Sequence, residues 1–356
     1  MRIAVIGTGI SGLSAAWLLQ RHADLVVYEQ NGYAGGHSNT VEVPGESLSV
    51  PVDTGFIVFN ERNYPNLTAM FRLLGVKSHT SDMSFAASID GGRIEWAGDN
   101  LSTLFAQRRN LLSAAHWRML RDILRFNRDG KRSLREGLDV AVTLGEYLDK
   151  HAYSLELRYR YLLPMAAAIW SCPMDSMLKF PACSFLRFCD NHCLLNIIDR
   201  PRWRTVSGGS CEYVRKLTQP LAGRMHFNSA VVSVRRVPQG VCVKDSAGRE
   251  AYYDRVVMAT HADQSLAMIT DVDDTERALL GAFKYQDNRA VLHSDASLMP
   301  ERRSVWSSWN YIADDSQDDT ARVSVSYWMN RLQKLATQNN YFLTLNPLRE
   351  PLAESV

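Results

Sequence analysis

The stretch RIAVIGTGISGLSAAWLLQRHADLVVYE, residues 2–29, predicts a strand, a tight turn, a helix and a second strand in immediate succession. Residues 2–6 form an apolar run typical of a strand, and residues 7–12 form a glycine-rich turn. Residues 13–21 have helical spacing of apolar side chains, and residues 25–28 form the second strand. This order predicts a unit in which one helix connects two parallel strands.

The three glycines of the turn have the spacing GxGxxG, and each has a physical role in a dinucleotide-binding loop. Gly7 permits the sharp turn, Gly9 lets backbone N–H groups approach a pyrophosphate, and Gly12 lets the helix pack against the strand. The N-terminus of the helix then favours an anion. Glu29, 17 residues after Gly12, is placed to accept hydrogen bonds from a ribose diol. The stretch predicts a dinucleotide site; the alternative is an ordinary strand–helix–strand unit whose glycines only serve packing.

The composition is that of a soluble globular protein with about two domains. The chain has 356 residues, of which 46% are hydrophobic and 22% charged, and a net charge of +2. This balance excludes a nucleic-acid footprint for the chain as a whole. Glycines interrupt the apolar N-terminus, which argues against a signal peptide, and no apolar run reaches the roughly 18 residues of a transmembrane helix.

The cysteines are crowded into one third of the chain, without a CxxC pair or a disulfide framework. They are Cys172, Cys183, Cys189, Cys193, Cys211 and Cys242. This usage predicts a reduced, cytoplasmic protein. Cys189, His192 and Cys193 are close in sequence, but no second pair nearby completes a tetrahedral zinc site. We therefore predict no metal.

Two further segments carry glycines near the predicted cofactor site. Residues 35–37 read GGH, a glycine pair that a nicotinamide cofactor does not require, and residues 52–59 read VDTGFIVF, a strand interrupted by one glycine. In order and spacing, these segments together with residues 2–29 resemble the flavin-containing amine oxidase and phytoene desaturase superfamily. The resemblance implies an α/β fold with a Rossmann-like FAD-binding domain, oxidoreductase activity, and FAD rather than NAD.

The resemblance also implies which residues bind FAD. Glu29 matches the ribose-binding acid, Gly36 and His37 match residues near the pyrophosphate and ribityl chain, and Val231 matches the residue whose backbone meets the adenine. The cofactor-binding residues that we expect are Gly7, Gly9, Ser11, Gly12, Glu29, Gly35, Gly36, His37, Gly55, Phe56 and Val231. No catalytic side chain is predicted, because the flavin supplies the redox chemistry.

The predicted elements divide the chain into two discontinuous domains. The FAD-binding domain comprises residues 1–80 and 205–265, and the substrate domain, with α+β insertions, comprises residues 81–204 and 266–350. The other predicted elements are helices at 64–74, from 143, at 212–217 and at 275–283; a hairpin of 83–89 and 93–96; strands at 230–237, 241–245, 251–260, 289–293, 305–311 and 322–328; and an acidic loop with Asp314, Asp315, Asp318 and Asp319.

Residues 111–135 predict a helix of unusual charge. Between Arg108 and Arg135 there are nine basic residues and two acidic ones. Such a helix is suited to peripheral contact with an anionic membrane through residues 117–128. The alternative is a solvated face whose apolar side packs into the core.

The middle of the chain is rich in aromatic residues, which either line a pocket for an apolar substrate or pack in the core. The segments SDMSF (81–85), IWSCP (169–173), FCDNH (188–192) and RPRW (200–203) resemble bacterial FAD-dependent oxidoreductases. They also resemble the oxidase-like region ahead of plant cyclopropane fatty-acid synthases. This resemblance implies a small-molecule substrate that is apolar or an amine, with the acyl chain of a membrane lipid as one candidate.

One departure from the superfamily pattern concerns the C-terminal part of the chain. Superfamily members end with a glycine-rich strand-to-helix segment that contacts the FAD phosphates, and residues 346–356 contain no such segment. The rival hypothesis is therefore an impaired FAD- or lipid-binding module that another chain completes. An NAD-dependent dehydrogenase is a third alternative, but it leaves residues 35–37 unexplained. The pattern determines neither the electron acceptor nor the oligomeric state.

Overall fold

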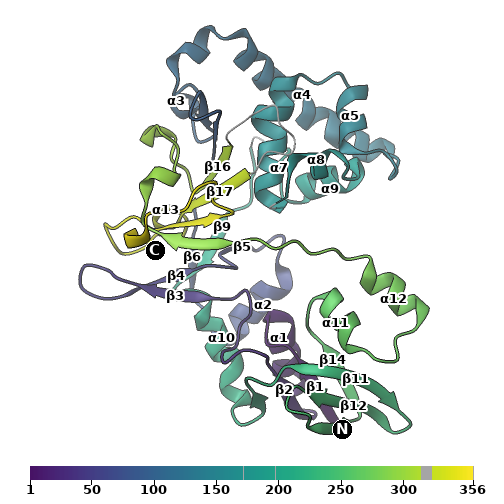
Figure 1. Cartoon of the computed structure of the whole chain (residues 1–356). Coiled ribbons are helices and arrows are strands. Elements are labelled where there is room, and N and C mark those ends of the chain that lie inside the picture. The colour runs from purple at the N-terminus through teal and green to yellow at the C-terminus, as the bar shows by residue number, and fades with distance from the viewer. Residues whose placement is uncertain (171, 197, 314–322, 356) are drawn as a thin grey trace.

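The computed structural model describes residues 1–170, 172–196, 198–313 and 323–355, and its lower part in Figure 1 is built on a parallel sheet. The strand order of this sheet is β10–β2–β1–β14. The bounds are β10 (Met225–His226), β2 (Asp24–Tyr28), β1 (Arg2–Ile6) and β14 (Arg255–Met258). Helix α1 (Ile10–Leu19) connects β1 to β2. The strand–helix–strand prediction for residues 2–29 is confirmed, and the helix begins three residues earlier than predicted.

Residues of β1 are buried on both faces of the sheet, which explains the unbroken apolar run. Ile3 and Val5 pack with Leu13 of α1, whereas Ala4 and Ile6 belong to a second cluster with residues of an antiparallel meander. The strands of that meander are β11 (Val231–Val237), β12 (Gly240–Asp245) and β13 (Glu250–Tyr253). The parallel sheet is thus sandwiched between helices and the meander, and we call this assembly the parallel-sheet unit.

Two predicted strands were wrong in their extent, because each divides between two sheets. The predicted strand at 251–260 ends in the meander as β13, turns at Asp254 and continues as β14 beside β1. The predicted strand at 52–59 divides into β4 (Val50–Asp53), paired with β3 (Thr40–Val43), and β5 (Val58–Asn60). Strand β5 forms a three-stranded sheet with β9 (Trp203–Val206) and β6 (Ser78–Thr80).

A six-stranded mixed sheet forms the second part of the molecule, in the order β15–β18–β17–β16–β7–β8. The bounds are β15 (Ala290–His293), β18 (Phe342–Leu345), β17 (Val323–Trp328), β16 (Trp309–Ala313), β7 (Phe85–Ile89) and β8 (Ile94–Ala97). The β7–β8 hairpin is confirmed. The strand predicted at 305–311 begins only at Trp309, and β18 was not predicted. The predicted acidic loop at Asp314, Asp315, Asp318 and Asp319 lies outside the described residues.

Helices pack against this sheet and enclose the largest hydrophobic core; we call the sheet and these helices the mixed-sheet unit (Figure 1). They are α3 (Leu101–Leu104), α4 (Ala114–Glu136), α5 (Leu144–Lys150), α6 (Leu155–Leu157), α7 (Leu163–Trp170), α8 (Met174–Leu178) and α9 (Ala182–Asn191). The predicted start of α5 is confirmed, because Thr143 and Glu146 form a capping box. Short helix α13 (Met329–Leu332) follows β17.

The remaining helices belong near the parallel sheet. They are α2 (Pro65–Leu74), α10 (Cys211–Thr218), α11 (Ala262–Met268) and α12 (Asp274–Gly281). Helix α12 packs on α11, which contacts β11, so residues 274–281 lie beside the parallel-sheet unit although they were assigned to the substrate domain. The domain division itself stays a prediction. Within the described residues, no helix has both the length and the apolarity to cross a membrane.

Candidate cofactor site

A cavity of about 1070 Å³ lies at the carboxyl ends of β1, β2 and β14, which is where open α/β sheets bind ligands. Of the predicted site residues, Gly7, Gly9, Ser11, Glu29, Gly35, Gly36, His37, Phe56 and Val231 line it. The structure therefore brings together residues that are as much as 224 positions apart in the chain. Gly12 and Gly55 are not among its lining residues.

Gly12 and Gly55 support the cavity wall from behind. A Cβ atom at Gly12 would lie 1.9 Å from the carbonyl oxygen of Gly7, and one at Gly55 would lie 2.1 Å from that of His37. A Cβ atom at Gly9, by contrast, would meet nothing within 4 Å. Gly9 lines the cavity, so this open space is room for a ligand against the backbone, as the motif requires.

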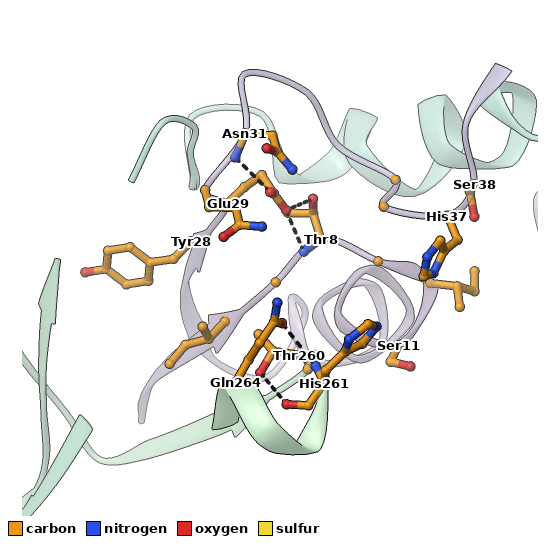
Figure 2. Close-up of a pocket in the computed structure, with 18 of the residues that line it drawn as sticks. Thr8, Ser11, Tyr28, Glu29, Asn31, His37, Ser38, Thr260, His261 and Gln264 are labelled. Carbon is orange, nitrogen blue, oxygen red and sulfur yellow. Dashed lines mark hydrogen bonds between the residues drawn. The ribbon is translucent and has the colours of Figure 1, made fainter. Parts of the chain in front are cut away.

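Glu29 is held in place by backbone and side-chain donors on one side of the cavity (Figure 2). One carboxylate oxygen accepts hydrogen bonds from the Thr8 backbone N–H, at 3.0 Å, and from the Thr8 hydroxyl. The other accepts from the Asn31 N–H at 2.9 Å. A carboxylate offers about four acceptor sites, so these three hydrogen bonds leave one site for a ribose hydroxyl.

Residues that follow β14 form the opposite side, and sequence reasoning missed two of them, His261 and Gln264. Thr260, His261 and Gln264 line the cavity there, and Figure 2 shows them facing the Glu29 side. The Gln264 side chain accepts a hydrogen bond from the His261 N–H at 3.3 Å. The signal that could have found them is topological, because a strand parallel to β1 and adjacent to it ends at the same edge of the sheet.

The lining residues carry little formal charge. Among the described lining residues, Glu29 is the sole carboxylate, and neither lysine nor arginine occurs. An anionic ligand is therefore met by backbone N–H groups at the N-terminus of α1, where the helix dipole is positive. The rings of His37 and His261 are stacked at the edge of this region, with centroids 6.0 Å apart.

Asp53 ties the segment before Phe56 to the mixed-sheet unit. Its buried carboxylate accepts hydrogen bonds from the Ser210 N–H at 2.7 Å, the Thr40 hydroxyl at 2.7 Å and the Gln333 amide at 2.9 Å. The Gln333 side chain in turn accepts from the Asp53 N–H at 2.8 Å. Burial raises the pKa of Asp53, and these hydrogen bonds partly offset that rise.

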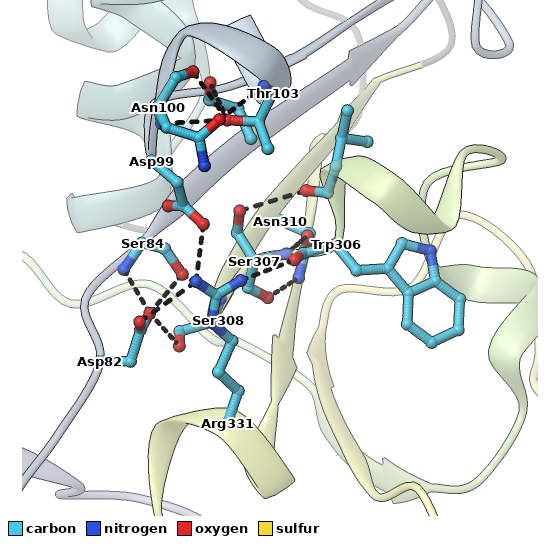
Figure 3. Close-up of polar contacts among 12 residues, drawn as sticks. Asp82, Ser84, Asp99, Asn100, Thr103, Trp306, Ser307, Ser308, Asn310 and Arg331 are labelled. Atoms are coloured by element: carbon cyan, nitrogen blue, oxygen red, sulfur yellow. Dashed lines mark hydrogen bonds and ion pairs between the residues drawn. The ribbon is translucent and has the colours of Figure 1, made fainter. Parts of the chain in front are cut away.

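A second polar cluster lies in the mixed-sheet unit, where Arg331 joins segments far apart in sequence (Figure 3). Its guanidinium lies 3.2 Å from Asp82 and 2.6 Å from Asp99. The Asp82 carboxylate also accepts a hydrogen bond from the Ser84 N–H, at 2.9 Å, and another from the Ser308 hydroxyl, at 2.9 Å. We call these five residues the Arg331 network.

The thiols and histidines near α9 do not form a metal site in the described part of the chain, where no group of three or more His, Cys, Asp or Glu is placed to hold an ion. All six cysteines are free thiols. The Cys193 sulfur instead accepts a hydrogen bond from Arg62 at 2.9 Å.

Comparison with known proteins shows the family of the chain. The sequence model of the family described as flavin containing amine oxidoreductase matches residues 10–271, most of the chain. The chain belongs to this family. It is therefore an FAD-dependent oxidoreductase, with the cofactor and the fold class that the family resemblance implied. No curated protein sequence matches the chain.

Solved structures of similar fold include oxidases and an isomerase. Putrescine oxidase bound to putrescine has 15% sequence identity and a TM-score of 0.68, covering 98% of this chain and 76% of the oxidase. Cyclohexylamine oxidase from Brevibacterium oxydans has 16% identity and a TM-score of 0.65, covering 97% and 75%. The CLA-producing fatty acid isomerase from P. acnes has 15% identity and a TM-score of 0.64, covering 99% and 79%. At these identities the likeness shows the fold alone.

The cavity of this flavoprotein fits FAD, because Gly9 leaves room against the backbone and the phosphate charge meets a helix N-terminus. When bound, FAD accepts a hydride from the substrate. The protein positions the FAD and the substrate and excludes water from between them. Gly35 is held near the turn by a 3.0 Å hydrogen bond from its N–H to the Thr8 carbonyl, which keeps the two glycine segments together.

Proposed function

We propose that Glu29 binds the ribose of FAD, that the glycine segments at 7–12 and 35–36 hold the pyrophosphate, and that Val231 meets the adenine. The free acceptor site on Glu29 and the open space at Gly9 support this assignment. In the same orientation the flavin ring extends toward Phe56, which lines the cavity with Tyr64. The substrate then meets the flavin near these two aromatic rings.

We propose further that the substrate is apolar, with the unsaturated acyl chain of a lipid as the favoured class. The observation that carries this proposal is a row of aromatic rings that begins at the cavity. Tyr64 lies 6.3 Å from Phe56 and 6.5 Å from Trp203 between ring centroids. Each of these rings is only partly buried, so each retains surface that a ligand can cover.

The row continues from the cavity into the helices of the mixed-sheet unit. His192 is stacked 6.5 Å from Trp203 and 4.0 Å from Phe188, and Phe188 lies 4.5 Å from Trp170. The row consists of aromatic side chains without a carboxylate, so it is a largely apolar surface rather than an ionic anchor. Apolar and π-rich surfaces of this kind suit an acyl chain or a polyene.

An amine is the second candidate, because the chain belongs to the amine oxidoreductase family. Aromatic rings also attract cations through their faces, which supports this alternative. Against it stands the charge of the cavity, whose sole described carboxylate, Glu29, already accepts three hydrogen bonds. We also propose that an acyl-chain substrate is taken from a membrane, which residues 117–128 contact.

The test is an anaerobic screen with the FAD-loaded protein. Unsaturated acyl lipids, polyenes, and mono- and diamines are added separately, and bleaching of flavin absorption is followed. We expect acyl lipids to bleach the flavin, and a Trp203→Ala variant to need a higher lipid concentration for the same rate. Bleaching by amines alone would overturn the acyl-chain proposal and favour the amine reading.

A further inference from the structure

Large apolar side chains are exposed around the start of α4. This helix lies at the end of the molecule away from β1, β2 and β14 (Figure 1). Leu112 is 94% exposed, Leu111 is 47% exposed and Trp117 is 51% exposed. The two leucines end a short 3-10 helix, Arg108–Leu112, that immediately precedes α4. Contiguous exposed apolar side chains of this size mark an interaction surface.

The structure holds this apolar tip in place. The Trp117 indole N–H donates a hydrogen bond to the Leu111 carbonyl at 2.9 Å, and its ring lies 5.3 Å from that of the buried Phe105. The Ser113 hydroxyl accepts a hydrogen bond from the His116 N–H and so caps α4 directly after Leu112. Leu112 is therefore presented by a fixed turn.

The exposed face of α4 continues the apolar tip with alternating apolar and cationic side chains. Trp117, Arg121, Leu124 and Arg128 are spaced at i, i+4, i+7 and i+11, so they lie on one helix face. Leu124 is 55% exposed. The Arg121 and Arg128 side chains are 77% and 72% exposed.

Two of the three acidic side chains of α4 lie beside this face, and they leave it with excess positive charge. Asp122 is buried and shared by Arg121, at 3.9 Å, and Arg125, at 3.4 Å. Asp129 is likewise buried and shared by Arg128 and Arg132, at 3.3 and 3.2 Å. Each carboxylate therefore serves two guanidinium groups. The solvated-face alternative accounts for these ion pairs, but it does not account for the exposed leucines.

We propose that this surface, formed by Leu111, Leu112, Trp117, Arg121, Leu124 and Arg128, docks on an anionic lipid bilayer. Leu111 and Leu112 insert among the acyl chains, and the arginines lie at the level of the anionic headgroups. The membrane contact extends beyond the helix to the turn before it. A nucleic acid or another polyanion satisfies the arginines but leaves the leucines exposed, so the bilayer is the partner that fits both.

The experiment is co-sedimentation of the FAD-loaded full chain with vesicles of phosphatidylglycerol mixed with phosphatidylcholine, compared with phosphatidylcholine alone. Leu112→Asp is expected to lower the partition coefficient on anionic vesicles about tenfold or more, since the variant loses the leucine side chain that the bilayer would bury. Arg121→Gln and Arg128→Gln are each expected to lower it about fivefold, and added salt to weaken binding of the unmodified protein.

The matched controls are Leu48→Asp, whose side chain is 82% exposed in the β3–β4 loop, and Arg277→Gln on the exposed face of α12. Both should leave the partition coefficient unchanged, and thermal melts check that all variants fold. No binding to anionic vesicles, equal binding to phosphatidylcholine alone, or no effect of Leu112→Asp would each overturn the proposal. Because vesicle binding needs no substrate, its failure is distinguishable from failure of the flavin-reduction screen.

Discussion

The cofactor cavity and the Arg331 network both bring distant segments together, but they use different atoms. At the cavity, close backbone approach dominates: Gly12 has no room for a Cβ atom, and Gly35 donates from its N–H to the Thr8 carbonyl. In the Arg331 network, side chains do the joining, and Arg331 lies 249 residues from Asp82. The backbone contacts at the cavity require glycine at particular positions. The Arg331 network requires only that oppositely charged groups and hydroxyls lie within contact distance.

This difference predicts how each region responds to mutation. A backbone contact cannot yield when a Cβ atom is added, so the change is expected to affect fold and cofactor together. When one member of a partly exposed side-chain network is mutated, water solvates the remaining partners. The free energy of unfolding therefore falls by only part of the interaction energy. The predictions below separate the two regions in order of expected effect.

The largest effect is expected for Gly12→Ala, because the new Cβ atom would lie 1.9 Å from the Gly7 carbonyl oxygen. Overpacking usually costs about 1–3 kcal/mol, and a clash with backbone cannot be relieved by a rotamer change. We expect loss of flavin and of most soluble protein, measured by flavin absorption and thermal melting. Gly9→Ala is the matched control: it should fold normally and lose only flavin affinity. Equal melting temperatures for Gly12→Ala and Gly9→Ala would contradict the comparison.

Glu29→Ala is expected to weaken FAD binding by about 10- to 100-fold, since a hydrogen bond to a charged group contributes about 1.5–3 kcal/mol. The measurement is the FAD dissociation constant from titration of the apoprotein. Glu29→Gln keeps one acceptor oxygen and should weaken binding less. Unchanged affinity in Glu29→Ala would remove Glu29 from the ribose site.

Arg331→Gln is expected to lower the free energy of unfolding by about 1–2 kcal/mol, because Asp82 and Asp99 lose a cation in a partly exposed setting. The FAD dissociation constant should not change, since Arg331 does not line the cavity. Arg289→Gln is the control, because its ion pair with Glu350 is largely exposed. Loss of flavin in Arg331→Gln would show that the two regions are coupled.

The smallest effect is expected from mild acid, and it should arise in the mixed-sheet unit. Burial lowers the pKa of His116, helped by the charge of Arg160, and burial likewise lowers the pKa of His293. The unfolded chain, with histidine pKa values near 6.5, then binds more protons than the fold. The contribution of these histidines to the free energy of unfolding is therefore fully present above about pH 6.5. It falls as the pH drops toward their pKa values in the folded protein.

This pH dependence is checked by denaturant unfolding at pH 7.5 and 5.5. His116→Gln should reduce the difference in free energy of unfolding between the two pH values, because the proton-binding difference at His116 is removed while those at His151 and His293 remain. An unchanged difference in this variant would argue that other groups cause the acid sensitivity.

The sequence by itself determined the parallel-sheet core and a dinucleotide cofactor, and the resemblance to a known family narrowed that cofactor to FAD. Residues 2–29 are contiguous, and glycine spacing, apolar runs and the acid at the end of a strand are local properties that a pattern can carry. The same holds for the capping box at Thr143 and the β7–β8 hairpin. Of the predicted site residues in the two glycine segments, Gly7, Gly9, Ser11, Gly35 and Gly36 line one cavity, and their binding roles stay predictions.

Only the tertiary structure decided where the long predicted strands divide and which distant side chains meet. The break at Asp254 depends on pairing, because β13 joins the meander whereas β14 pairs with β1. His261 and Gln264 reach the cavity because β14 lies beside β1. The exposed surface at α4 likewise depends on the fold, which buries Asp122 and Asp129 and leaves Leu112 exposed. Exposure and strand adjacency are set by packing of the whole chain, which no local spacing records.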